Sequence, residues 1–149
     1  MRAELVGAGR RGTGGLGPPA GRYDDPMAAR IAEATPRDAI VARLDDEAHC
    51  VALAVRDDAD AMLRAETIVG AFGEPLLTIE GSWTVRVNVG VAFRPAGTPC
   101  ATAGLLREAR TALLQARRLG PGCALLFDPA VPHALPRSSC RRNRSGHHA

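Results

Sequence analysis

The stretch Ile40–Val55, IVARLDDEAHCVALAV, contains two apolar runs separated by a short acidic break. The runs are Ile40–Leu44 and Cys50–Val55, and the break is Asp45-Asp46-Glu47. Apolar runs on both sides of such a break are typical of two antiparallel strands joined by a hairpin turn. We therefore expect a β-hairpin whose turn carries the three acidic residues.

Three more segments have the pattern of strands. In Trp83–Phe93 every second residue is apolar, which predicts a strand with one buried face. Leu76–Glu80 is expected to pair with it through a turn at Gly81-Ser82. Cys123–Phe127 is a last short apolar run, which predicts a further strand.

Helices are expected at 26–35, 59–72 and 102–119. Pro26 suits the first turn of the first helix, and Asp57 or Asp58 can cap the second, because an Asp side chain accepts hydrogen bonds from free amides. Thr102 is the expected cap of the third, and Gly120 follows its end.

The hairpin resembles the RLGGDEF hairpin of the GGDEF family, the diguanylate cyclases that join two GTP molecules into cyclic di-GMP. Arg43 and Leu44 match the start of this motif, and Glu47 keeps an acid at the position of its Asp. Asp45 and Asp46 replace the two glycines, and Ala48 and His49 replace the closing Glu and Phe.

Two later segments resemble the same family, in the same order. Thr84–Ala92 is similar to its strand ending in S-hydrophobic-G-hydrophobic-A, with Asn88 at the Ser position. Arg107–Gly120 is similar to its helix ADxALYxAKxxG. In that helix Ala109, Ala112, Leu113, Ala116 and Gly120 are retained, and Arg110, Leu114 and Arg117 replace Asp, Tyr and Lys.

The resemblance implies an α+β fold of the GGDEF or palm-like type, a central mostly antiparallel sheet flanked by helices, here with an eroded first strand. Residues 1–21 form a Gly/Pro-rich segment in which Ala3–Val6 is the expected remnant of that strand, because Leu16–Gly21 resembles the family's LGHxxG segment. Residues 22–130 are the expected degenerate GGDEF-like domain. Residues 131–149 are an Arg-rich tail that we expect to be disordered.

The resemblance also implies how catalysis is lost. A cyclase holds a triphosphate with closely approaching backbone amides and with metal-bound carboxylates. Asp45 and Asp46 bring two negative charges to the phosphate position, and like charges about 4 Å apart repel by ~1 kcal/mol in water and ~4 kcal/mol near a protein surface. The family's first-strand Asp, Lys and Asn fall in Leu5–Gly14, which contains none of these residue types.

No catalytic residue and no cofactor are therefore expected at the degenerate motif. Glu47 and Asp46 are the candidate metal ligands, and Mg²⁺ is expected only with residual activity. The Arg-x-x-Asp of the family's inhibitory product site falls on Pro36 and Ala39, so we expect this site to be lost. His49 and Cys50 are adjacent on a strand and point to opposite faces, which favours core packing of Cys50 over a metal pair.

The predicted function is a catalytically inactive domain that senses a nucleotide or docks another protein in cyclic di-GMP-type signalling. One alternative is a weak diguanylate cyclase, a nucleotidyltransferase that uses Asp45, Asp46 and Glu47. The other is a decayed fragment without a selected role.

Charge and composition limit the partners. The net charge is +3, no apolar run is long enough for a membrane span, and the four cysteines have no metal-ligand spacing. We expect a cytoplasmic, reduced protein whose partners are GTP or another protein domain, with homodimerisation left open and no membrane contact. The Arg-rich tail lacks aromatic residues for base stacking, which argues against nucleic acid.

Overall fold

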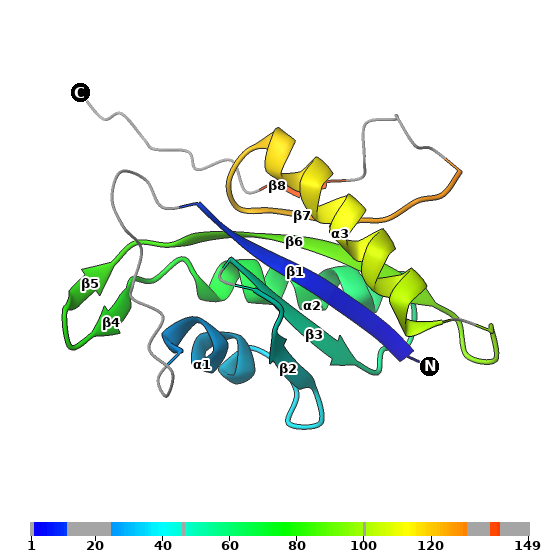
Figure 1. The fold of residues 1–149 in the computed structure, drawn as a ribbon, viewed down its shortest axis with the longest axis horizontal. Coiled ribbons are helices and arrows are strands. Elements are labelled where there is room, and N and C mark those ends of the chain that lie inside the picture. The colour runs from blue at the N-terminus through cyan, green and yellow to red at the C-terminus, as the bar shows by residue number, and fades with distance from the viewer. Residues whose placement is uncertain (1, 12–24, 46, 100, 131–137, 141–149) are drawn as a thin grey trace.

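The computed structural model describes residues 2–11, 25–45, 47–99, 101–130 and 138–140 as a sheet with helices on both faces (Figure 1). The helices are α1 (Pro26–Glu33), α2 (Asp58–Ala71) and α3 (Thr102–Leu119). The strands are β1 (Arg2–Arg11), β2 (Ile40–Arg43), β3 (Ala48–Leu53), β4 (Leu76–Thr78), β5 (Gly81–Trp83), β6 (Arg86–Arg94), β7 (Cys123–Leu126) and β8 (Ser138–Cys140).

The main sheet has six strands in the order β2-β3-β1-β6-β7-β8, and β4 and β5 form a separate two-stranded sheet. Only the β6–β7 pair is parallel among these strands. The helices α1 and α2 cover one face, and α3 covers the other over β1 and β6 (Figure 1). The predicted α+β fold with a mostly antiparallel central sheet is therefore confirmed.

The first strand is not eroded, which corrects one part of the prediction. It runs from Arg2 to Arg11 and pairs antiparallel with both β3 and β6, with an irregularity between Val6 and Ala8. The predicted remnant Ala3–Val6 is only part of it. A central strand is held by backbone hydrogen bonds on both edges, so the Gly-, Ala- and Arg-rich segment pairs without the apolar alternation that marks other strands.

The strand β6 also differs from the prediction. Trp83 belongs to β5, and β6 begins only at Arg86. Both of its faces are buried, because Val87, Val89 and Val91 pack in the α1/α2 core while Ala92 packs with α3. The alternating valines predicted one buried face of β6. The second buried face was not predicted because the residues between the valines are small or polar.

The predicted cap of α2 is confirmed, the predicted cap of α3 is wrong, and the cap of α1 was not predicted. Asp25 caps α1, and the Asp57 side chain accepts a hydrogen bond of 2.8 Å from the Asp60 amide at the start of α2. Thr102 does not cap α3, since the N-cap is Ala101 and has no side-chain hydrogen bond. None of the helices described here is both long and apolar enough to cross a membrane.

The C-terminal segment contains a strand where the composition predicts disorder. β8 pairs antiparallel with β7, with Cys123 opposite Cys140, and Cys123 is disulfide-bonded, contrary to the expected reduced state. Residues 131–137 and 141–149 of the predicted tail lie outside the described residues, as do the LGHxxG-like residues 16–21.

We predict that Gly90→Ala destabilises the protein by about 1–3 kcal/mol or more, as overpacking of a core does. A Cβ at Gly90 would lie 2.1 Å from the Ala109 carbonyl oxygen and 2.3 Å from the Leu113 amide nitrogen, so α3 would have to move away from β6. Gly104→Ala in α3 is the matched control, because its Cβ would meet no atom within 4 Å. Urea unfolding should show a loss for the first variant and none for the second.

We also predict that deleting residues 1–8 abolishes cooperative unfolding. The deletion removes most of β1, and each buried backbone group left without a partner costs ~1–3 kcal/mol against a total stability of ~5–15 kcal/mol. Deletion of residues 141–149, beyond the last described strand, is the control. Thermal unfolding and size-exclusion profiles that are alike for the two deletions would contradict the central role of β1.

Candidate functional site

The predicted hairpin turn connects β2 and β3, and the side chain of Asp45 accepts a hydrogen bond within it. Arg43 and His49 are register partners, and the Leu44 amide donates to the Ala48 carbonyl at 2.9 Å. Within the turn, Asp45 Oδ1 accepts a hydrogen bond of 2.8 Å from the Glu47 amide. A backbone amide that could face an anion is thus already occupied by a carboxylate of the chain.

Two arginines lie beside this turn. Arg43 Nε donates to the Asp45 carbonyl oxygen at 3.1 Å, and Arg110 of α3 places Nη2 4.0 Å from Asp45 Oδ2. The Asp45 and Arg110 side chains are both about half exposed, so this ion pair contributes little to stability. It nevertheless gives the Asp45 carboxylate a cationic neighbour from the protein itself.

The structure describes one of the two predicted metal ligands. Glu47 is exposed, and Asp46 lies outside the described residues. Among the residues that the structure describes, there is no group of three or more His, Cys, Asp or Glu side chains that could hold a metal ion. The Mg²⁺ site therefore remains a prediction from sequence.

Asp25, at the start of α1, forms polar contacts with this hairpin that the sequence did not predict. Asp25 Oδ2 lies 2.7 Å from Nε2 of His49, and Asp25 Oδ1 accepts hydrogen bonds of 3.0 Å and 3.1 Å from the Met27 and Ala28 amides. A carboxylate only accepts hydrogen bonds, so Nε2 of His49 carries the proton. One carboxylate thus caps α1 with one oxygen and binds β3 with the other.

His49, rather than Cys50, is the more buried of the two adjacent residues. His49 is only 5% exposed and faces α1, whereas Cys50 is half-buried on the α3 side. The prediction of opposite faces is confirmed, but the assignment of Cys50 as the core residue is incomplete. His49 Nδ1 is buried and has no hydrogen-bond partner in the described part of the chain.

The environment of Asp25 favours its charged form. Burial raises the pKa of the Asp25 carboxyl, but hydrogen bonds from His49 and from the Ala28 and Met27 amides outweigh burial and hold the pKa below its ordinary value of 3.8. Arg43 Nη1 adds a cation 4.0 Å from Oδ2. The Asp-Pro pair at 25–26 is a helix-start signal, whereas the contact with a histidine 24 positions away has no local signal.

The structure also describes two charged residues near the expected position of the lost inhibitory product site. Arg37 and Asp38 lie exposed in the connection between α1 and β2. Neither forms an ion pair with another residue that the structure describes.

Comparison with solved structures identifies the fold. A protein from M. capsulatus described as an EAL/GGDEF domain protein superposes with a TM-score of 0.71 at 23% identity, over 86% of each chain. The chain has the fold of a GGDEF domain. No protein-family model and no curated protein matches the sequence.

Other GGDEF domains superpose in the same way. The GGDEF domain of YfiN (TpbB) from Pseudomonas aeruginosa gives a TM-score of 0.68 at 22% identity, over 85% of this chain and 83% of that one. The active GGEEF domain of a diguanylate cyclase from Vibrio cholerae gives 0.63 at 14% identity, over 86% and 84%. At these identities the GGDEF fold is shared, while the residues at the hairpin must be judged on their own.

We predict that Asp25 makes this GGDEF-fold domain sensitive to acid. Because the pKa of Asp25 is lower in the folded protein than in the unfolded chain, its stabilisation is present above the unfolded pKa and is lost as the pH falls through the folded pKa. The free energy of unfolding should therefore fall between about pH 5 and about pH 3, and less steeply in Asp25→Asn, which keeps a capping oxygen.

The control for this measurement is Asp38→Asn, which replaces an exposed aspartate. Asp60 contributes equally to all three proteins: its pKa is lowered chiefly by a hydrogen bond from the Arg56 amide, which outweighs its burial. Equal slopes for wild type and Asp25→Asn in urea unfolding from about pH 5 to about pH 3 would contradict the role of Asp25.

Proposed function

We propose that this GGDEF-fold domain is catalytically inactive and acts as a protein-docking module in cyclic di-GMP-type signalling. The observation that carries the proposal is the hydrogen bond from the Glu47 amide to Asp45 Oδ1. In a nucleotide-binding turn, such amides must remain available to phosphate oxygens. Here a phosphate would have to displace a carboxylate that is covalently part of the turn.

The charges around the turn support the same conclusion. The Asp45 carboxylate would repel a triphosphate, and the Arg110 guanidinium, with Nη2 4.0 Å from Asp45 Oδ2, is already paired with that carboxylate. A metal-dependent transfer also needs carboxylates that converge on the ion, and Glu47 is the only predicted ligand that the structure describes. Nucleotide sensing is the second candidate function, and calorimetric titration with GTP and cyclic di-GMP distinguishes it from docking.

The signalling context rests on resemblance. Neighbours with the same fold include the active GGEEF domain from Vibrio cholerae and the GGDEF domain of DgcB from Caulobacter crescentus in complex with c-di-GMP. An inactive domain of this fold can retain its surfaces for partners while losing its chemistry, because fold and site residues are separable.

We predict that the purified protein forms no cyclic di-GMP from GTP and Mg²⁺. Asp45→Gly combined with Asp46→Gly should free the turn amides but still give no product, because Leu5–Gly14 supplies no Asp. Chromatographic analysis of the reaction checks both proteins. Wild-type turnover that disappears in Glu47→Ala would overturn the proposed inactivity.

Calorimetric titration with GTP and Mg²⁺, and separately with cyclic di-GMP, distinguishes docking from sensing. For a docking module we expect no heat of binding with either compound. Heat from GTP in wild type that is unchanged in Asp45→Gly would identify a sensing site away from the turn.

A further inference from the structure

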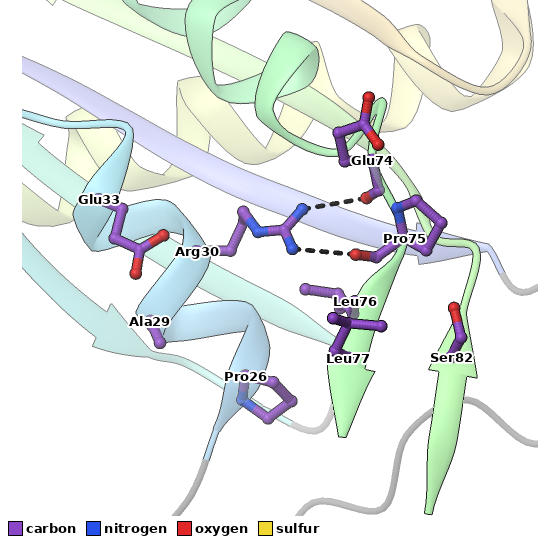
Figure 2. Close-up of a pocket in the computed structure, with 9 residues that line it drawn as sticks. All are labelled: Pro26, Ala29, Arg30, Glu33, Glu74, Pro75, Leu76, Leu77 and Ser82. Atoms are coloured by element: carbon purple, nitrogen blue, oxygen red, sulfur yellow. Dashed lines mark hydrogen bonds between the residues drawn. The ribbon is translucent and has the colours of Figure 1, made fainter. Parts of the chain in front are cut away.

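A groove lies between α1 and the β4–β5 hairpin (Figure 2). It has a volume of about 570 Å³. One wall is a single stripe of α1 at the spacing of successive helical turns, and the other is β4 with the residues leading into it. The lining residues are Pro26, Ala29, Arg30 and Glu33 on α1 and Glu74, Pro75, Leu76, Leu77 and Ser82 opposite.

The strand wall of this groove has an open edge. Among the described strands, β4 pairs only with β5, and β4 lies between α1 and β5 (Figure 2). Its other edge therefore faces the groove. Unpaired backbone groups along a strand edge are a template for another extended segment.

The groove also presents apolar surface. Leu77, which lines the groove, is 80% exposed, whereas its neighbour Leu76 is buried. A large apolar side chain with this exposure becomes more stable when a partner covers it and removes its surface from water. An apolar side chain from a partner would be covered against Leu77.

The charge of the groove selects the type of partner. Glu33 and Glu74 are exposed and form no ion pair with any other residue that the structure describes. Arg30 is held by the backbone, since its guanidinium donates to the carbonyl oxygens of Ala71, Glu74 and Pro75 at 2.9–3.0 Å. Arg30 thereby already compensates the negative C-terminal end of α2, whose last residue is Ala71. The charges that favour a cationic partner are therefore those of Glu33 and Glu74.

We propose that this groove binds an extended segment of a partner protein in which basic and apolar side chains alternate, added as a third strand beside β4. The alternation follows from strand geometry, because successive side chains point to opposite sides of the backbone. Basic side chains would meet Glu33 and Glu74, and apolar ones would cover Leu77. The inference rests on the proposed docking function and specifies its surface.

The probe for this proposal is the fluorescein-labelled peptide TRVRVRT, measured by fluorescence anisotropy with the full chain. Two matched peptides separate the contributions: TEVEVET reverses the charges, and TRVRVRT with N-methylated valines loses strand-type amide donors. Each matched peptide should bind at least about tenfold more weakly than TRVRVRT, a difference that corresponds to a few charge pairs or hydrogen bonds.

The groove is tested by Glu33→Gln combined with Glu74→Gln, which keeps side-chain size and removes both charges. This variant should bind TRVRVRT about threefold to tenfold more weakly, and added salt should weaken binding to wild type more than to the variant. Glu66→Gln, at an exposed position on α2, is the control and should bind as wild type does. Unchanged thermal unfolding of both variants establishes that the fold is retained.

Several results would overturn the groove assignment. They are no binding of TRVRVRT to wild type, equal binding of TEVEVET or of the N-methylated peptide, and equal weakening by Glu66→Gln. Self-association that is lost in the double variant, measured by sedimentation, would instead make a second copy the occupant. Formation of cyclic di-GMP by the same preparation would overturn the proposed inactivity and leave the peptide result unaffected.

Discussion

The pairing of β1 between β3 and β6 is the interaction on which the rest of the structure depends. The two neighbours are distant in the chain, and β1 connects them through backbone hydrogen bonds on both of its edges. This pairing fixes the plane against which α1 and α2 pack on one side and α3 on the other. Without it, two buried strand edges would lose their partners, at a cost that a domain of this size cannot absorb.

Three close or polar contacts fix how α3, β7 and α1 meet the central strands. At Gly90 the backbone of α3 comes too close for any side chain, so this helix sits directly on the strand. Two residues earlier, the buried Asn88 accepts a hydrogen bond of 2.9 Å from the Cys123 amide and ties β6 to the start of β7. On the other side of the sheet, Asp25 joins the start of α1 to His49 of β3. Each of these polar or close contacts fixes how one element meets the next.

The sequence by itself determined several of the elements and the loss of the cyclase motif. Apolar periodicity located the β2–β3 hairpin, α2 and α3, because helices and strands that bury one face must repeat apolar residues at 3.6 or 2 positions. The replacement of two glycines by Asp45 and Asp46, together with the absence of Asp from Leu5–Gly14, is also a property of the sequence alone. Together with the resemblance to the GGDEF family, these features lead to the fold class and to the prediction of inactivity.

Only the tertiary structure decided how these residues are connected. The length of β1 was not predicted because its sequence lacks apolar alternation, whereas the structure shows its backbone paired with β3 and β6. The contact between Asp25 and His49 and the groove beside β4 were hidden because each joins residues separated by many positions in the chain. Local patterns report which face of an element is buried, whereas the partner on that face is chosen by the packing of the whole domain.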